Sequence, residues 1–495
     1  MKIINIDESK KINKYENNLN KFLFIINENY HLIINTIFFF KIIFLFLLLF
    51  IFIKYLNDLI FQFSKNVNLT KNDILEIMKY INITFNDSKI IDKIKIAIYS
   101  HSLSNGGVER NTALLINYLS KIKLFDLYIF IDEISNNEYD ISKNVKRAVI
   151  SYNSKKLKRY LLSNKINIFI YQFYDKPIIT MLKSLKNIKT IFYNHSCFLF
   201  WIYTYDKYIF ENVYNEYKNS KYIISIIPFE NNYLLKEWGI NTIYMNNFLT
   251  YDYSKVIPSD LSSKKILMIG RGSDKNKRFE LGIKTMKYII KEIPDSEMIV
   301  ISDDNDIPYI KKLVNFLDLK NNIKFVGYTS TPEIYFKDAS LHIFPTIAEA
   351  FPMVLSETKI YGIPNILMGI DYVSTSKGGV LIVYDDNPET AAKYAINILN
   401  NDKYRKKLGK EARKSMKKFN NENLFKKWVK LIILINKGEV YCQKLSEVDK
   451  KIFKKEALNI LENQVYLLKK RIPKMENITL QNLLNFSFVK NINYK

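Results

Sequence analysis

Two glutamates, Glu349 and Glu357, are the residues of this 495-residue sequence whose type and spacing first suggest chemistry. Eight positions separate them, which is too far for one pair of carboxylates that share a proton. They offer instead two separate hydrogen-bond acceptors along one extended polar ligand. By spacing alone, two solvated surface glutamates explain the pattern better, so the interpretation depends on the elements that position them.

The segment around these glutamates predicts a strand, a loop and a helix. Leu341–Phe344 is typical of a short buried strand, and Pro345 ends it. Pro352 can begin a helix because the first helical residue needs no partner for an N–H group. Gly362 and Pro364 predict the end of this helix after about three turns. The free amides and the positive dipole end of such a helix suit a phosphate group or a sugar hydroxyl.

A second pattern of strand, loop and helix occurs earlier in the chain. Ile94–Ser100 predicts a buried strand, Gly106 and Gly107 follow in a loop, and an apolar-periodic helix extends to Leu119. Glycines at this place let the backbone approach a ligand closely. Two adjacent glycines are weak evidence on their own, because most such pairs mark ordinary turns.

Two further groups of residues deserve a functional interpretation beside a structural one. His195 lies at the carboxyl end of a predicted strand, Thr190–Tyr193, which is the edge where open α/β sheets bind ligands. A lone histidine is nevertheless more often structural. Arg271 follows another predicted strand and begins a basic loop, which a solvated surface loop would also explain.

Three parts of the glutamate segment together resemble the donor-site signature of the retaining group 1 glycosyltransferases (glycosyltransferase family 4, GT-B fold). These parts are Phe344-Pro-Thr346, Glu349-Ala-Phe-Pro352 and Gly362-Ile-Pro364. The sequence Gly106-Gly-Val-Glu-Arg110 resembles the first-loop signature of the same family. The resemblance covers about residues 94–436.

The resemblance implies a site for a nucleotide-sugar donor. Arg271 and Lys277 would grip the diphosphate, Glu349 would bind the transferred sugar, and Glu357 would accept hydrogen bonds from the ribose. His195 matches a histidine that contacts the transferred sugar in the family. The remaining residues that the resemblance places at the donor are Gly106, Gly107, Ala350, Phe351, Pro352 and Met353.

The basic loop departs from the family pattern. The usual spacing between the arginine and the lysine is tighter, and Arg278 stands where a glycine usually follows the lysine. Lys275 or Arg278 could therefore be the true partner of the diphosphate. His101 is a second and weaker histidine candidate, on the acceptor side.

Composition and charge narrow the function classes. The formal net charge is +25, which suits nucleic acid or an anionic membrane surface. We favour the membrane because no nucleic-acid-binding module is recognisable. Cys197 and Cys442 give neither a disulfide framework nor a metal spacing and indicate a reducing compartment. No cluster of metal ligands is recognisable, so we expect neither a metal nor another cofactor.

A hydrophobic segment near the N-terminus predicts membrane attachment. Residues 32–56 are long enough to cross a hydrocarbon core of about 30 Å as a helix, with Lys41 near one end. A buried or amphipathic surface helix is the alternative. Slightly more lysines follow the segment than precede it, which weakly places the later domains on the cytoplasmic side.

The predicted fold class is α/β: a GT-B protein with two Rossmann-like domains that face a cleft, preceded by a hydrophobic helix. Alternating strand and helix patterns support this architecture, and the tail shows helical periodicity without a recognisable role. The predicted organisation is a polar extension (1–31), a transmembrane helix (32–56), a linker (57–92), an acceptor domain (93–250), an interdomain linker (251–263), a donor domain (264–436) and a helical tail (437–495).

The sequence thus predicts a metal-independent glycosyltransferase that moves a sugar from a nucleotide-sugar donor, with retention, to a glycan or lipid-linked acceptor near a membrane. Surface polysaccharide, lipopolysaccharide or glycolipid synthesis would be its setting. A catalytically silent GT-B scaffold that binds nucleotide or glycan is one alternative, and a GT-B phosphorylase or epimerase is another. The pattern specifies neither the sugar, the base, the acceptor nor the oligomeric state.

Overall fold

The computed structural model describes residues 93–484, with gaps at 105, 136, 174, 205–206, 304–306 and 440–446. The described residues all fall in one compact unit. Among the helices within this range, none is long and apolar enough to cross a membrane. The predicted extension, membrane helix and linker at residues 1–92 lie outside the described residues, so the membrane segment stays a prediction.

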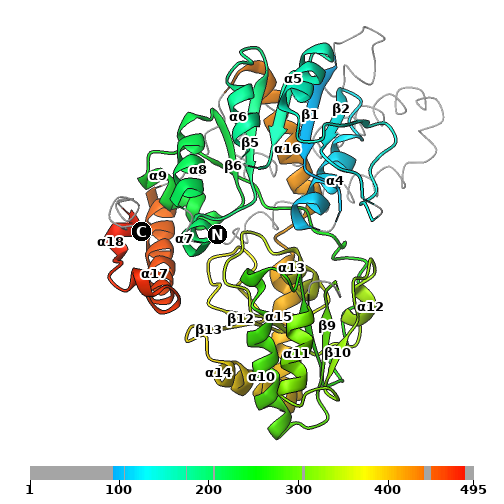
Figure 1. Cartoon of the computed structure of the whole chain (residues 1–495), viewed down its shortest axis with the longest axis vertical. Coiled ribbons are helices and arrows are strands. Elements are labelled where there is room, and N and C mark those ends of the chain that lie inside the picture. The colour runs from blue at the N-terminus through cyan, green and yellow to red at the C-terminus, as the bar shows by residue number, and fades with distance from the viewer. Residues whose placement is uncertain are drawn as a thin grey trace, which may run out of the picture. The chain divides into compact units, whose positions relative to one another are not determined.

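The first half folds around a seven-stranded sheet in which all neighbouring strands are parallel (Figure 1). Its strand order is β3-β2-β1-β4-β5-β6-β7. Ile96 of β1 lies beside Leu127 of β2 and Ile168 of β4, and all three are buried, as expected of a sheet covered on both faces. The strands are β1 (Ile94–Ser100), β2 (Phe125–Ile131), β3 (Lys146–Val149), β4 (Ile168–Tyr171), β5 (Lys189–Asn194), β6 (Tyr222–Ser225) and β7 (Ile243–Tyr244).

The two strands of this sheet that sequence analysis missed are the edge strands. β3 reads Lys-Arg-Ala-Val and is partly exposed, so no apolar alternation marks it, and β7 is only two residues long. Both strands are defined by hydrogen bonds to neighbouring strands, and a local sequence pattern contains no information on such hydrogen bonds. The helical elements of this half are α4 (Gly107–Leu119), α5 (Ser154–Ser163), α6 (Lys176–Leu182), α7 (Phe198–Thr204), α8 (Lys207–Asn219), η2 (Glu230–Leu234) and α9 (Leu235–Glu237).

The second half has a six-stranded parallel sheet with the order β10-β9-β8-β11-β12-β13. Buried aliphatic side chains from this sheet and from α10 and α14 form one core. The strands are β8 (Lys265–Ile269), β9 (Glu297–Ile301), β10 (Ile323–Phe325), β11 (Leu341–Phe344), β12 (Asn365–Met368) and β13 (Val380–Val383). The helical elements are η3 (Lys275–Lys277), α10 (Phe279–Glu292), α11 (Pro308–Phe316), α12 (Glu333–Phe336), α13 (Met353–Ile360), α14 (Pro388–Asn400), α15 (Asp402–Met416) and α16 (Asn421–Lys437).

The glutamate segment folds as strand, loop and helix, with one correction. Pro352 has a ψ of 111° and precedes the helix, which begins at Met353, so the proline caps the helix instead of forming its first residue. Gly362 has a φ of +75°, a conformation that favours glycine, and it follows the last turn of α13. Glu349 lies in the loop and Glu357 within α13, as predicted.

Helix α16 returns to the first half, as the resemblance implied, and Figure 1 shows it among the elements of that half. Trp428 of α16 is fully buried, and its ring centre lies 5.1 Å from that of Tyr193 in β5. Asn421 also accepts a hydrogen bond from the backbone N–H of Leu249 at 2.7 Å. The two sheets are therefore joined by a packed helix as well as by the linker.

The tail beyond α16 forms α17 (Glu447–Arg471), η5 (Pro473–Met475) and α18 (Leu480–Leu484). The tail is helical here, as its periodicity predicted, and Leu461 and Leu468 of α17 are almost completely buried, whereas Ile452 is exposed. Helix α17 packs against η2 of the first half.

Candidate active site

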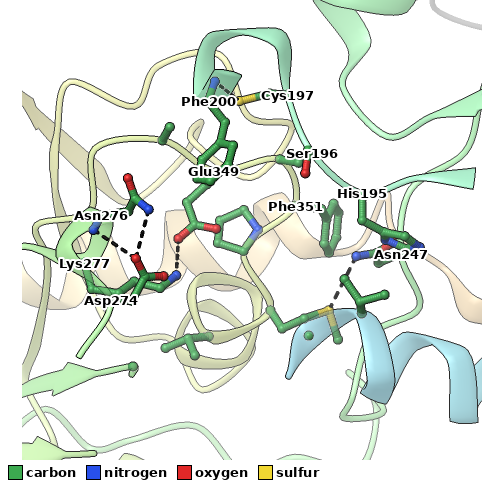
Figure 2. A pocket seen from close by; sticks show the side chains of 18 of the residues that line it. His195, Ser196, Cys197, Phe200, Asn247, Asp274, Asn276, Lys277, Glu349 and Phe351 are labelled. Carbon is green, nitrogen blue, oxygen red and sulfur yellow. Dashed lines mark hydrogen bonds and ion pairs between the residues drawn. The ribbon is translucent and has the colours of Figure 1, made fainter. Parts of the chain in front are cut away.

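A cavity of about 300 Å³ lies between the two halves (Figure 2). It is lined by loops that follow strands of both sheets and by the first turns of α4 and α13. Of the residues predicted to form the site, Gly106 and Glu357 do not line it. The lining residues are Gly107, Val108, His195, Ser196, Cys197, Phe200, Ile226, Asn247, Ile269, Gly270, Arg271, Asp274, Asn276, Lys277, Phe344, Ala348, Glu349, Ala350, Phe351, Pro352, Met353 and Val354.

Two helices begin at this cavity, one from each half. Neither Gly106, before α4, nor Pro352, before α13, supplies a side-chain hydrogen bond to the first turn. The first amides of α13 therefore have no side-chain cap from Pro352, whereas at α4 the carboxylate of Glu109 lies beside Gly106 and accepts a hydrogen bond from its own backbone N–H. A Cβ atom at Gly107 would lie 3.2 Å from Cγ of Met353, so glycine permits this close approach. The arrangement suits an anion such as a diphosphate.

Lys277 and Glu349 face each other across this cavity, as Figure 2 shows. The Nζ of Lys277 lies 2.5 Å from Oε1 of Glu349, and both side chains are mostly buried. Thr346 donates a hydrogen bond to the same carboxylate oxygen at 3.1 Å. The backbone N–H of Glu349 donates to the hydroxyl of Tyr372 at 3.0 Å, which fixes the loop. The carboxylate thus holds the ammonium group inside the cavity.

The structure distinguishes the basic residues that were predicted as partners of the donor diphosphate. Arg271 lines the cavity with an exposed side chain and lies 3.8 Å from Asp274. Lys275 is exposed and does not line the cavity. Arg278 turns away, because its Nε donates to the carbonyl of Pro345 at 2.7 Å. Lys277 is therefore the residue of this basic loop that joins Arg271 at the cavity.

Arg278 also shows why a glycine is usual at its position. Its φ is +46°, in the left-handed region, where a residue with a side chain is under strain. Its guanidinium lies 3.1 Å from Asp386, so an ion pair holds a conformation that glycine would adopt without strain.

His195 lines the cavity as a neutral imidazole. Its Nε2 lies 2.8 Å from Oε1 of Gln172, whose amide nitrogen donates to the carbonyl of Tyr99. This orientation of the amide puts the proton of His195 on Nε2 and leaves a lone pair on Nδ1. Burial lowers the pKa of His195 to about 3. Nδ1 is buried and has no hydrogen-bond partner among the described residues.

Glu357 occupies a different environment from the one that the resemblance implied. Its Oε1 accepts hydrogen bonds from Arg110 of α4 at 2.5 Å and from Thr250 at 2.7 Å, and the side chain is almost fully buried. Burial alone would lower the pKa of Arg110, but the adjacent carboxylate raises it. In this structure Glu357 joins the two halves, and its binding of the donor ribose stays a prediction.

His101 lies outside the cavity lining. Its Nδ1 is 2.8 Å from Oδ2 of Asp132, and the hydroxyl of Tyr99 donates to the same oxygen at 2.5 Å. His101 is therefore not a residue of this cavity, and its role on the acceptor side stays a prediction.

Sequence analysis missed Gln172, Asn247 and Tyr372 as residues of the site or its support. Gln172 follows the predicted strand β4 directly, so the rule that ligands bind at carboxyl ends of strands could have found it. Asn247 accepts a hydrogen bond from the hydroxyl of Tyr193 at 3.1 Å, and no sequence signal marked it. The described residues contain no group of three or more His, Cys, Asp or Glu side chains that could hold a metal ion. Metal independence stays a prediction.

Comparisons with known proteins relate most of the second half to a known family. Residues 252–415 match the family model described as glycosyl transferases group 1. The poly(glycerol-phosphate) alpha-glucosyltransferase of Bacillus subtilis is 25% identical over 180 residues, which are 36% of this chain and 25% of that protein. The GalNAc-alpha-(1->4)-GalNAc-alpha-(1->3)-diNAcBac-PP-undecaprenol alpha-1,4-N-acetyl-D-galactosaminyltransferase of Campylobacter jejuni is 25% identical over 189 residues, 36% of this chain and 52% of that one.

A solved structure extends the comparison to both sheets. The sucrose-phosphate synthase from Thermosynechococcus elongatus aligns with a TM-score of 0.57 and 18% identity, over 70% of this chain and all of that one. The chain spans between a quarter and about half of the length of the curated relatives that it matches. Residues 252–415 are therefore similar to the group 1 glycosyltransferases, and the two sheets together have the GT-B fold.

Proposed function

We propose that this protein transfers a sugar from a nucleotide-sugar donor to a glycan or lipid-linked acceptor, with retention of anomeric configuration. The observation that carries the proposal is the cavity between the halves, where the uncapped start of α13 meets the cations of Lys277 and Arg271. Such a site suits a diphosphate beside a sugar, and the names of the matched relatives describe transferases of this kind.

Different residues of the cavity bind the diphosphate and the sugar. Lys277 and Arg271 neutralise the diphosphate, whose negative charge grows as the bond from the anomeric carbon to the phosphate oxygen breaks. Glu349 accepts hydrogen bonds from the sugar, and the imidazole of His195 packs beside the sugar. A neutral His195 is suited to this role because a cationic ring would oppose the positive charge that develops on the sugar.

The proposed chemistry is a front-face displacement. A hydroxyl oxygen of the acceptor forms a bond to the anomeric carbon on the side that the diphosphate leaves. The proton of that hydroxyl passes to the departing phosphate oxygen, so no separate base or glycosyl-enzyme intermediate is needed. The start of α13 stabilises the leaving group at the same time.

The acceptor and the location follow from sequence features outside the described residues. The hydrophobic segment at 32–56 and the net charge of +25 favour a membrane-attached protein that acts on a membrane-proximal acceptor at the cytoplasmic face. Assembly of surface polysaccharide, lipopolysaccharide or glycolipid fits such an acceptor.

Calorimetric titration of the full chain with UDP, GDP and ADP, in buffer with EDTA, tests the donor site. We expect at least one nucleoside diphosphate to bind without a divalent metal, because side-chain cations and helix dipoles supply the positive charge. Binding should raise the melting temperature in the same buffer. Binding that appears only when magnesium or manganese replaces EDTA would contradict the metal-independent mechanism, and no binding under either condition would contradict the proposed function.

A further inference from the structure

The backbone of the loop that carries Glu349 is held by hydrogen bonds to groups outside the loop. The carbonyl of Ile347 accepts a hydrogen bond from Nη1 of Arg471 at 3.4 Å, and its N–H donates to the carbonyl of Asn276 at 2.8 Å. The N–H of Glu349 donates to the hydroxyl of Tyr372. Arg471 is the last residue of α17, so one of these tethers comes from the tail.

Arg471 is a buried junction between three segments. Its guanidinium makes two hydrogen bonds to the carboxylate of Asp386, at 2.6 and 2.8 Å, with Nε and Nη2 as donors. Nη2 also donates to the carbonyl of Met368 at 3.0 Å, and Nη1 to the hydroxyl of Tyr203 at 3.1 Å. The side chain is only 5% exposed. Such a fork of donors fixes the positions of its partners more strictly than a lysine could.

Asp386 connects Arg471 to the basic loop that contains Lys277. The same carboxylate pairs with Arg278, the residue next to Lys277, at 3.1 Å. Burial would raise the pKa of Asp386, but the hydrogen bonds from Arg471 and the charge of Arg278 lower it, so the carboxylate stays ionised between two guanidinium groups. Arg471 therefore acts on both sides of the Lys277–Glu349 pair.

A second tether runs from the tail to the backbone of Glu349. Asn463 and Gln464 of α17 donate hydrogen bonds to the two carboxylate oxygens of Asp371, at 2.8 and 2.9 Å. The next residue, Tyr372, accepts the N–H of Glu349. Gln464 is completely buried and also accepts a hydrogen bond from Tyr203 at 3.0 Å.

The close packing of the tail requires a glycine at position 369. Its φ is +73°, and a Cβ atom there would lie 2.5 Å from Cδ1 of Leu467 and 2.8 Å from Nη2 of Arg471. A side chain at this position would push α17 away from the strand that precedes the Tyr372 segment. The tail thus packs on this segment as tightly as a core element does.

We propose that the C-terminal tail is part of the catalytic unit and that Arg471 is a positioning residue for Glu349 and Lys277. This inference rests on the proposed function of the cavity, and it gives a role to a tail that lies beyond the residues matched by the family model. Arg471 does not line the cavity. It sets the distance between the sugar-binding carboxylate and the phosphate-binding cation.

The test compares Arg471→Met with Lys470→Met in the full chain. Lys470 is the matched control because it is adjacent, exposed and bound only to the carbonyl of Asp385 among the described residues. Arg471→Met should remain folded, since Asp386 keeps Arg278 as a partner. We expect amide hydrogen exchange at Ile347 and Glu349 to become about tenfold faster in Arg471→Met and to stay unchanged in Lys470→Met.

Turnover supplies the second readout. Release of sugar from the donor should fall by about tenfold to a hundredfold in Arg471→Met while nucleotide affinity stays within about threefold, because misplaced groups harm the transition state more than the ground state. Arg471→Lys should recover only part of the loss. Unchanged exchange at Ile347 and Glu349 in Arg471→Met would overturn the proposal whether or not the protein transfers sugar. A wild-type protein that binds no nucleotide and releases no sugar would instead contradict the proposed function.

Discussion

Replacing Lys277 with methionine is expected to lower the rate of sugar transfer by about a hundredfold or more. The Nζ of Lys277 is held inside the cavity by Glu349, 2.5 Å away, and the cation faces a leaving group whose negative charge grows in the transition state. Methionine has a similar length but no charge. Because the missing interaction strengthens as the bond breaks, the loss should appear in turnover more than in nucleotide affinity.

Lys275→Met is the matched control for this prediction. Lys275 lies in the same short helical turn, but it is exposed and does not line the cavity. Initial rates of donor turnover, measured beside nucleotide affinity for both variants, separate a local electrostatic role from the general effect of removing a lysine. If Lys275→Met loses activity and Lys277→Met does not, the diphosphate partner has been assigned to the wrong lysine.

Replacing Glu357 with glutamine is expected to weaken nucleotide binding by about tenfold or more. A neutral amide keeps the shape of the side chain but would weaken the charge-assisted hydrogen bonds that the resemblance predicts to the ribose, each worth about 1.5–3 kcal/mol. Such hydrogen bonds would exist before and during the reaction, so turnover at saturating donor should change much less than affinity.

The ion pair between Arg110 and Glu357 gives this prediction a sharper control. Arg110→Gln breaks the same contact between the halves but leaves the carboxylate free for the ribose. We expect its melting temperature to fall by a few degrees, while its nucleotide affinity is unchanged or tighter because a competing partner is gone. Equal losses of affinity in both variants, measured by calorimetry, would mean that Glu357 only joins the halves.

Local signals were sufficient to predict the elements that carry the site. Leu341–Phe344 and Ile94–Ser100 are short and mostly apolar, and both occur as strands with the expected bounds. His195 does lie at the carboxyl end of its strand and lines the cavity. The central strands of a parallel sheet are buried on both faces and are therefore nearly continuous apolar runs. Such runs can be recognised from the sequence alone.

The parts that sequence reasoning missed depend on contacts between distant residues. The partner of Glu357 is Arg110, 247 positions earlier, and no local pattern contains that pair. Edge strand β3 shows too little burial to be marked by hydrophobicity. The role of the tail was missed for the same reason, since Arg471 acts on a loop 124 residues away.

The most direct test of the central claim is the anomeric configuration of the first sugar released. The full chain is incubated with UDP-glucose, UDP-N-acetylglucosamine, UDP-galactose and GDP-mannose in separate samples, and proton NMR follows the anomeric signals before mutarotation. We predict that at least one donor is cleaved in the presence of EDTA and yields first the same anomer that the donor carries. Release of the opposite anomer would contradict retention, and no cleavage of a donor whose nucleotide binds the protein would contradict the account of this cavity as a transferase site.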